Sequence, residues 1–352
     1  MDRSRQETRD DRLETYSSLR NYEGLLSDKE DAIHTCIHSN NMFRFHQTQC
    51  DLRCVILHVQ LRHLITATSK NDVFYYSGMS VEHWNPLTGI TKPAISFFSP
   101  ELFRFRCSTL AAFDNLLLCG GFDGQFVVKR LDASNDPVRI GTITTDLDSI
   151  TNHFHMLENS KCIISSNDKR LRILDLNTLS FSATFATDWS VNCAARSPDK
   201  AMVCAVGDSI DSLLLDATSG KVLDTLKGHR DYSFACAWSP CGTFLCTGNQ
   251  DKTTRIYDIR RTDRVLSVLQ GKMAAIRSLS FSGPQLVMAE AADFVHVIDI
   301  ATDTSQVIDF FGEIGGITIH SDNLFIANGD DNIGCIMQFR KTNTVCDLEA
   351  LV

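Results

Sequence analysis

The sequence predicts an all-β fold, a seven-bladed β-propeller with a short N-terminal helical extension, and two observations support that prediction. The segment 228–258 has the pattern of three short strands separated by turns, and the end of its third strand recurs at a regular interval along the chain. The chain has 352 residues, of which 43% are hydrophobic. Its length suggests two domains, but propellers reach this size as a single unit.

The template for the repeat has an apolar strand around Phe234, a second strand at 244–247 and a third strand at 253–259. The turns between them are rich in Gly, Pro, Asn and Asp, which favour tight reversals of the chain. Apolar and small residues alternate in the first strand, which favours a β-meander over a helix.

The third-strand end recurs seven times, near Asn85, Arg130, Asp175, Asp216, Asp258, Asp299 and Phe339. Successive ends are 45, 45, 41, 42, 41 and about 40 residues apart. A four-stranded repeat of about 40–45 residues is the blade of WD40 propellers, so the spacing predicts seven blades.

A buried series of hydrogen bonds is expected in the template blade. In this blade type, hydrogen bonds connect in series a His that follows Gly, a Ser or Thr of the second strand, an Asp of the turn and a Trp of the third strand. The matching residues here are His229, Thr247, Asp251 and Tyr257, with Tyr in place of Trp. Because an unpaired buried polar group costs about 1–3 kcal/mol, every member needs a partner. The other six repeats lack the full set and depend on apolar packing.

Several stretches resemble a known family, namely 235–238, 247–253, 274–278, 292–297 and 308–314, with 56–58 and 67–73 upstream. Together they resemble a family of uncharacterised plant and fungal WD-repeat proteins over roughly residues 50 to 340, and the segment 12–23 is also similar. The resemblance implies a transducin-like propeller and supplies no catalytic residues. Tyr257 departs from it, since the family usually has Trp there.

The chain divides into three predicted parts: a charged N-terminal extension at 1–40 with an amphipathic helix, the propeller at 41–345 and a C-terminal tail at 346–352. Apolar residues recur in the extension at steps of three and four, at Leu13, Tyr16, Leu19, Tyr22 and Leu26. This stripe predicts a helix. The helix either packs on the propeller flank or docks in the groove of a partner.

A strand that closes the last blade is expected at 42–46, where Phe43 and Phe45 alternate with polar residues. Closure by an N-terminal strand removes exposed sheet edges, which otherwise invite aggregation. The tail at 345–352 is the competing candidate for this role.

Composition limits the partners. The net charge is −9, with 34 basic and 43 acidic residues, which argues against nucleic-acid binding because phosphate binding needs clustered positive charge. The apolar run 116–119 is far shorter than the ~20 residues of a membrane span. Thirteen cysteines without a signal peptide predict reduced thiols in the cytoplasm or nucleus. We therefore expect protein partners, with no nucleic acid and no membrane.

The sequence predicts no catalytic, cofactor or metal site. His153 and His155 alternate on one strand, and Cys50 and Cys54 are four apart, but neither pair has the companions of a zinc site. The set Cys236, Cys241 and Cys246 is best explained by packing. An enzyme with a site in the central channel, for example a hydrolase, is the alternative from another class, and it predicts converging His and carboxylate side chains there.

A non-catalytic interaction scaffold is the main functional prediction. The residues before each first strand, and those in the turns between second and third strands, form an acidic rim with two aromatic residues: Asp148, Asp188, Trp189, Asp231, Tyr232, Gln250, Glu290, Glu313, Asp330 and Asp331. We expect this rim to receive a basic segment of a protein partner, with Trp189 and Tyr232 as aromatic anchors. The alternative is an ordinary solvated surface.

A second interaction motif is the run from Tyr257 to Arg260. It is similar to the Trp-Asp-x-Arg box by which some WD40 proteins attach to the adaptor of cullin-4 ubiquitin ligases. In that reading Asp258 belongs to the box and Arg260 pairs with adaptor carboxylates. The alternative function is then a ligase substrate receptor. If the motif is fortuitous, Arg260 is simply a solvated residue at a strand end.

Overall fold

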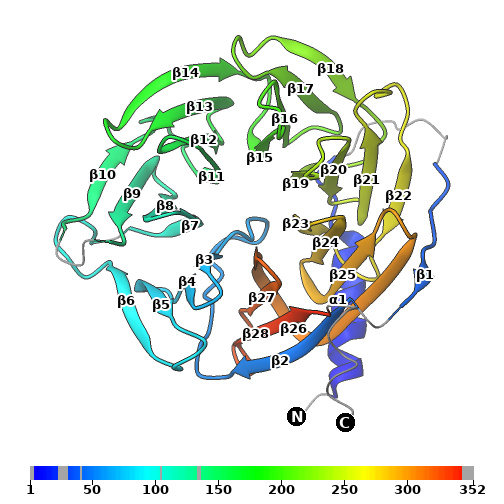
Figure 1. The fold of residues 1–352 in the computed structure, drawn as a ribbon, viewed down its shortest axis with the longest axis horizontal. Helices are drawn as coiled ribbons and strands as arrows, with labels where there is room; N and C mark the ends of the chain where they lie inside the picture. Colours follow the sequence, from blue (N-terminus) through cyan, green and yellow to red (C-terminus); the bar gives the residue numbers. More distant parts are fainter. Residues whose placement is uncertain (1–3, 23–30, 40–41, 104, 133–135, 343–352) are drawn as a thin grey trace.

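A computed structural model describes residues 4–22, 31–39, 42–103, 105–132 and 136–342. Its strands form antiparallel sheets arranged around a central axis (Figure 1). The innermost strand of each sheet contacts the innermost strand of the next around the whole ring. The chain is therefore a closed β-propeller, as the repeat spacing predicts. Within the described part of the chain, no helix is both long and apolar enough to cross a membrane.

Each of the first five blades is a separate four-stranded sheet. Blade 1 consists of β3 (Ile65–Ser69), β4 (Asp72–Tyr76), β5 (Ser80–Trp84) and β6 (Thr91–Ser96). Blade 2 consists of β7 (Cys107–Phe113), β8 (Leu116–Gly121), β9 (Gln125–Arg130) and β10 (Arg139–Thr142). Blade 3 consists of β11 (Thr151–Leu157), β12 (Lys161–Ser166), β13 (Arg170–Asp175) and β14 (Ser180–Ala186). Blade 4 consists of β15 (Val191–Arg196), β16 (Met202–Gly207), β17 (Ser212–Asp216) and β18 (Val222–Leu226). Blade 5 consists of β19 (Ser233–Trp238), β20 (Phe244–Asn249), β21 (Thr253–Asp258) and β22 (Ser267–Gln270).

Blades 6 and 7 share one long strand, so their strands form a single larger sheet. Blade 6 consists of β23 (Ile276–Ser282), β24 (Gln285–Glu290), β25 (Ala292–Asp299) and the first part of β26 (Thr304–His320). Blade 7 consists of the rest of β26, β27 (Asn323–Asn328), β28 (Cys335–Lys341) and β2 (Phe43–Gln49). The strand bends between them at Gly312, whose φ of 137° favours glycine. The seven predicted blades are present.

The N-terminal strand closes the ring. β2 pairs with β28 in antiparallel register, with Phe45 opposite Phe339, and the two rings contact edge to face with centroids 5.6 Å apart. This confirms the strand predicted around Phe43 and Phe45. The competing tail, 345–352, lies outside the described residues.

The core lies between neighbouring blades, because each blade buries both faces. The first strands are mostly buried; β19, for example, is buried along its whole length. Trp84 of blade 1 packs edge to face on Phe325 of blade 7. Burial of such side chains contributes about 1.5–3 kcal/mol each, which explains how blades without the template hydrogen bonds are held.

Polar side chains also join neighbouring blades near the start of their first strands. Six first strands have a register shift there, and such a bulge re-aims a side chain. In blades 2, 3 and 4 the shifted residue donates a side-chain hydrogen bond to a backbone carbonyl of the next blade. The donors and acceptors are Ser108 Oγ to Thr151 O (2.6 Å), Asn152 Nδ2 to Val191 O (2.9 Å) and Asn192 Nδ2 to Ser233 O (3.1 Å). In blade 5 the shifted residue is Phe234, and the Arg277 guanidinium lies over its ring at 3.9 Å.

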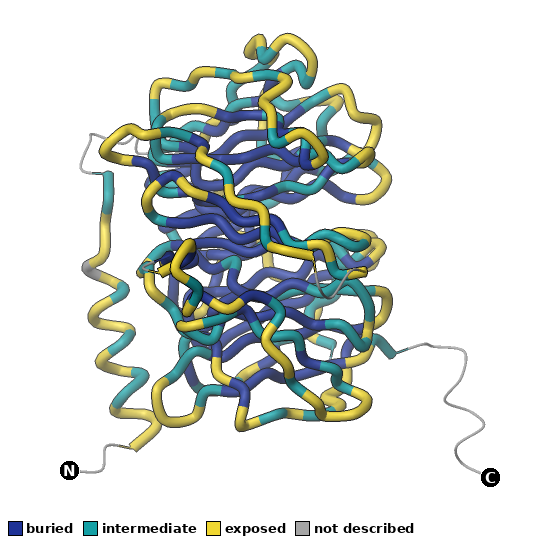
Figure 2. The backbone as a smooth tube through the Cα atoms, turned by 90° about the vertical axis from the view of Figure 1, so that its left-hand side faces the viewer, coloured by how far each residue is buried: buried dark blue, intermediate teal, exposed yellow. Residues whose placement is uncertain are grey.

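The N-terminal extension runs over the propeller. Helix α1 (Arg5–Ser18) lies along one face of the disc (Figure 2). The chain then passes along the outer edges of blades 5 and 6, where Ile33 bridges to Val268 and β1 (Ile37–His38) pairs in parallel with β26.

The helix begins and ends earlier than the apolar stripe predicts. Ser4 caps it, accepting a hydrogen bond from the backbone of Glu7, whose side chain accepts from the Ser4 backbone in return. Only Leu13 and Tyr16 of the stripe lie in the helix; Leu19 is its extended C-cap, and Leu26 lies outside the described residues. The bounds indicated by the stripe at 13–26 were therefore wrong, because the capping box of Ser4 and Glu7 decides where the helix begins.

Candidate functional site

The candidate site is the face of the disc formed by the loops before each first strand and the turns between second and third strands, and we call this face the rim. In a four-stranded meander these loops and turns lie at the same edge of every blade. The predicted rim residues therefore share one face. The structure brings some of them together with α1, buries others and leaves a third group open.

Helix α1 docks on the rim of blades 6 and 7 through arginines spaced three and four residues apart. Arg9 Nε donates to Asp293 Oδ2 at 2.9 Å, and Arg12 Nη1 donates to Asp293 Oδ1 at 2.7 Å. Asp293 lies in the turn between β24 and β25, with a side chain of 0% exposure. Because residues at this spacing share one helix face, the docking face of α1 is basic rather than apolar.

Two further carboxylates surround the same arginines. Arg9 Nη2 donates to Asp309 at 2.5 Å, Arg5 contacts the same carboxylate at 2.8 Å, and Arg12 contacts Asp330 at 3.4 Å. The hydrogen bond to Asp309 is the main reason that the pKa of Arg9 is raised. The rim of blades 6 and 7 thus holds a basic helix with charge-assisted hydrogen bonds, which are stronger than neutral ones.

Aromatic rings line this contact. The Arg9 guanidinium lies 4.8 Å from the centre of the Phe294 ring, and that of Arg12 lies 4.6 Å from the Phe311 ring. Tyr16 packs on a small apolar cluster that includes Met273. The rim therefore recognises both the charge and the flat guanidinium groups, which stack well on rings.

The chain after α1 covers part of blade 5. The Asn21 backbone N–H donates to both Asp231 carboxylate oxygens, at 3.2 and 3.0 Å, and Gln60 donates to the Asn21 side chain at 3.1 Å. Asp231 is 5% exposed. The predicted rim residue Asp231 is therefore occupied by the protein's own N-terminal segment.

Two predicted rim residues are buried, which corrects the prediction that they present their side chains to a partner. Glu290 is fully buried, and accepts hydrogen bonds from the backbone of Lys272, Met273 and Ala274 and a contact from His296 at 2.7 Å. Gln250 is 4% exposed and accepts from Arg277 at 2.5 Å. Both side chains hold loops of the propeller together.

Glu313, Asp330 and Asp331 lie together at the rim of blade 7. Arg62 contacts Glu313 at 3.2 Å, Arg53 pairs with Asp331, and Asp330 accepts from backbone groups of its own turn. The side chain of Asp331 is 82% exposed and that of Glu313 is 42% exposed. These acids are partly neutralised by arginines of the protein.

The rim of blades 3 to 5 is not covered by the described part of α1. Asp148 and Asp188 are exposed, and Trp189 and Tyr232 are half-buried. The Trp189 ring packs against the backbone of Gly207. We call Asp148, Asp188, Trp189, Asp208 and Tyr232 the open sector.

Asp208 belongs to this sector although sequence reasoning missed it. It accepts from Asn192 at 2.9 Å. Burial raises the pKa of Asp208, and the nearby charges of Asp148 and Asp231 raise it further. Burial also raises the pKa of Tyr232, with Asp208 adding to the effect. The open sector therefore has an excess of negative charge and is suited to a cation.

The template hydrogen bonds are formed around His229. Its two ring nitrogens lie 2.9 Å from Asp251 Oδ2 and 2.9 Å from Thr247 Oγ1. Tyr257 donates its hydroxyl to the carbonyl of Lys227 at 3.1 Å. Burial would raise the pKa of Asp251, but His229 and neighbouring hydrogen-bond donors outweigh it and bring the pKa to about 2. The set is structural and stabilises the loop that leads into blade 5.

The Asp258 and Arg260 pair lies at the end of β21, on the opposite face from the rim. Arg260 donates to both Asp258 oxygens, at 2.8 and 2.5 Å. These bonds bring the pKa of Asp258 to about 2. The Arg260 side chain is 72% exposed, but its guanidinium already has a carboxylate partner.

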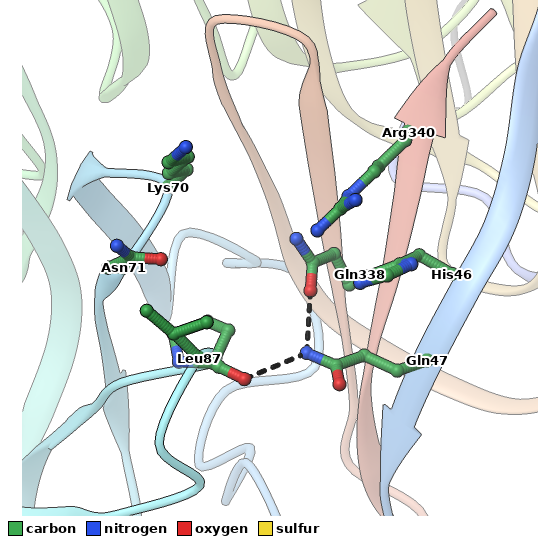
Figure 3. A pocket seen from close by; sticks show the side chains of 8 residues that line it. His46, Gln47, Lys70, Asn71, Leu87, Gln338 and Arg340 are labelled. Atoms are coloured by element: carbon green, nitrogen blue, oxygen red, sulfur yellow. Dashed lines mark hydrogen bonds between the residues drawn. The ribbon is translucent and has the colours of Figure 1, made fainter.

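A polar pocket of about 320 Å³ lies between blades 7 and 1 (Figure 3). Gln47 donates to Gln338 at 2.7 Å and to the carbonyl of Pro86 at 3.2 Å. The ionisable groups that line it are basic, namely His46, Lys70 and Arg340. Burial lowers the pKa of His46, and the positive charge of Arg340 lowers it further. The sequence spacing did not indicate this pocket, because its residues come from both ends of the chain.

Ring closure brings together three metal-binding residues that are far apart in the sequence. His63, His153 and Cys193 place one donor atom each within 4.8 Å of one another. The sequence analysis interpreted His153 as structural from the spacing of its neighbours in the chain. That spacing does not show which residues of different blades lie close together. The enzyme alternative predicted carboxylates converging with histidines, whereas this cluster combines histidines with a thiol.

The fold and the repeated blade define the class as a β-propeller of the WD-repeat type. The family described as "WD domain, G-beta repeat" matches residues 220–258, which contain most of blade 5. The chain is thus a WD40-repeat protein.

Three curated proteins are similar over part of their length. "Periodic tryptophan protein 2 homolog" of Schizosaccharomyces pombe is 33% identical over 24% of this chain and 10% of that protein. "Ribosome biogenesis protein YTM1" of Coccidioides immitis is 30% identical over 42% of this chain and 32% of that protein. "Mitochondrial division protein 1" of Candida glabrata is 26% identical over 46% and 20%. The chain spans about a third or less of the length of these relatives.

A solved structure has the same fold. A chain of "Crystal Structure of Mitotic Checkpoint Complex" superposes with a TM-score of 0.72, covering 91% of this chain and 99% of that chain at 14% identity. At this identity the likeness establishes the propeller and nothing about partners.

Proposed function

We propose that this protein is a non-catalytic interaction scaffold whose acidic rim receives a basic segment of a protein partner, and that the open sector of blades 3 to 5 is the part that the partner contacts. The observation that supports this most is the docking of α1. A basic helix occupies blades 6 and 7 by pairing arginines with Asp293, Asp309 and Asp330. The protein itself thus provides an example of the ligand that its rim accepts.

The chemistry of the open sector matches that example. Asp148, Asp188 and Asp208 supply carboxylates, and Trp189 supplies an aromatic face beside them. Carboxylates next to a ring suit Arg or Lys side chains. Aromatic residues also contribute much of the energy of protein interfaces. A partner segment with two or more basic residues is therefore the ligand class that we assign.

The relatives agree with a role in assemblies. One is named for ribosome biogenesis. We extend to this chain only the general role of a scaffold. The location predicted from the cysteine content, cytoplasm or nucleus, belongs to the same proposal.

The test uses the full chain and fluorescent peptides with two or three Arg or Lys residues at helical spacing. We expect binding that weakens with salt and falls at least tenfold in a D148N/D208N variant and in W189A. The matched control is Asp263→Asn, an exposed carboxylate on the opposite face, which should leave binding unchanged. Equal affinity of the wild type and both rim variants would refute the proposal.

The ligase-receptor alternative requires a separate test. Because Arg260 is already bonded to Asp258, an adaptor carboxylate would have to displace that partner. Binding of purified cullin-4 adaptor to the chain, lost in Arg260→Ala, is the result that this alternative predicts. Binding that Arg260→Ala leaves intact would contradict it.

A further inference from the structure

Three residues from different blades meet among the innermost strands. His63 precedes β3 and is tied to blade 2, because its carbonyl accepts from the Leu110 backbone at 2.6 Å. His153 and Cys193 each follow the bulge residue of their strand, in blades 3 and 4. Their equivalent positions explain why their side chains converge although 40 residues separate them in the sequence.

The distances between the donors are those of a metal site. Cys193 Sγ lies 3.6 Å from His153 Nδ1, and the rings of His63 and His153 have centroids 4.6 Å apart. A tetrahedral zinc ion with bonds of about 2.3 Å to sulfur and about 2.0–2.1 Å to nitrogen separates these atoms by about 3.5 Å. The site therefore needs only small side-chain movements to receive an ion.

The donor set selects a class of ion. Two imidazoles and one thiolate suit zinc and disfavour magnesium or calcium, which prefer oxygen ligands. Cys236 lies next to the thiol of Cys193, with the sulfurs 3.8 Å apart, and its S–H can donate to a thiolate there.

We propose that His63, His153 and Cys193 form a zinc-binding site at the inner strands of blades 1, 3 and 4, which ties these blades together across the axis of the propeller. Structural zinc sites contribute directly to folding free energy. A metal held by three blades stabilises the closed ring in a way that pairwise packing between neighbouring blades does not.

A second group of similar residues provides an internal control. His34, Cys36 and Asp303 also lie within 4.8 Å of one another, but at the outer edge of blade 6. Cys36 is half-buried there, whereas Cys193 is buried. We expect Cys36→Ser to leave zinc binding at the inner site unchanged.

The experiment measures zinc by mass spectrometry in the purified full chain after metal-free dialysis and re-addition of Zn²⁺, and follows Co²⁺ substitution by its thiolate charge-transfer absorption. We expect one tightly bound ion per chain, a Co²⁺ thiolate band and a Zn²⁺-dependent rise in melting temperature. Cys193→Ala and His153→Ala should each weaken Zn²⁺ binding at least tenfold and abolish the Co²⁺ band.

Cys246→Ala is the matched control, because it removes another fully buried thiol from a neighbouring blade. Circular dichroism checks that all variants are folded. Three results would overturn the proposal: a wild-type chain that takes up no Zn²⁺, equal uptake in Cys193→Ala and Cys246→Ala, or a Cys193–Cys236 disulfide in the protein as purified from the cell. If Cys193→Ala does not fold, the Co²⁺ spectrum of His153→Ala still decides the matter.

Discussion

Arg9 and Asp293 form an ion pair in which Nε and Oδ2 are 2.9 Å apart and the carboxylate side chain is completely buried. Asp293 also accepts from Arg12 and from the backbone of Gly312 at 2.8 Å. Its φ of 66° places it in the left-handed region, which Asp tolerates better than most residues. One turn residue thus connects the N-terminal helix to the junction of blades 6 and 7.

The first prediction concerns this pair. In an R9Q/R12Q variant we expect α1 to leave the rim, because two buried charge-assisted hydrogen bonds are each worth about 1.5–3 kcal/mol. Hydrogen exchange of residues 5–18 should accelerate by at least tenfold. Arg5→Gln is the control, since its pair with Asp309 is about half exposed and exposed pairs contribute about 0–1 kcal/mol. Unchanged exchange in the double variant would contradict the docking.

The second prediction is a pH dependence of docking. Burial acts to raise the pKa of Asp309, but Arg9 outweighs it and holds the pKa below the ordinary value of 3.8. A carboxylate whose pKa is lower in the docked state stabilises docking above about pH 4, and this contribution is lost as the pH falls through the lowered pKa. Exchange in α1, corrected for the intrinsic rate, should increase between pH 5 and pH 3. Asp309→Asn should be less docked at pH 5 and show a smaller increase.

The third prediction concerns the hydrogen bonds around His229. Thr247→Val keeps the shape but leaves a buried His229 nitrogen without its partner, so we expect a loss of about 1–3 kcal/mol in the free energy of unfolding. Thr254→Val in the next strand is the control. Its equally buried hydroxyl contacts the Met288 sulfur, a weak acceptor. Equal losses in the two variants, measured by urea unfolding, would refute the role of the network.

The fourth prediction concerns the strand shared by blades 6 and 7. At Gly312 an added Cβ would overlap the Asn328 side chain, and the φ of 137° is strained for other residues. We expect Gly312→Ala to cost about 2–4 kcal/mol. Gly89→Ala is the control, because φ is also positive (70°) but the space is open, and about 1 kcal/mol is expected. A thermal-unfolding series compares the two.

The template blade and the blade spacing were predictable because they are local. Alternation around Phe234 and the turn residues between strands set the meander, and a fixed repeat length implies a ring. The strand around Phe43 was predictable for the same reason, since its alternation is visible and a closed ring needs a final strand. The helix bounds were not, because the capping bonds of Ser4 and Glu7 decide where the helix begins. The helix docks mainly through its arginines, and Tyr16 of the apolar stripe packs beside them.

The rim was predicted only as a set of positions. Repeat position placed Glu290 and Trp189 alike at the rim, but the two side chains point to different surroundings: Glu290 inward to backbone N–H groups, and Trp189 against Gly207 at the surface. Asp293, Asp309 and the arginines of α1 were missed, although the steps from Arg5 to Arg9 to Arg12 were a visible helical signal. Their partners were not visible, because some 280 to 300 residues separate them.

The sequence by itself determined the number of blades, the order of strands and the residues of the hydrogen-bonded turn in blade 5, since each depends on neighbours within about one repeat. Only the tertiary structure decided that the basic helix returns to the acidic rim and that His63, His153 and Cys193 meet near the axis. The physical reason is ring closure: it brings distant repeats into contact, and the direction of each side chain there depends on bulges and packing that no single repeat specifies.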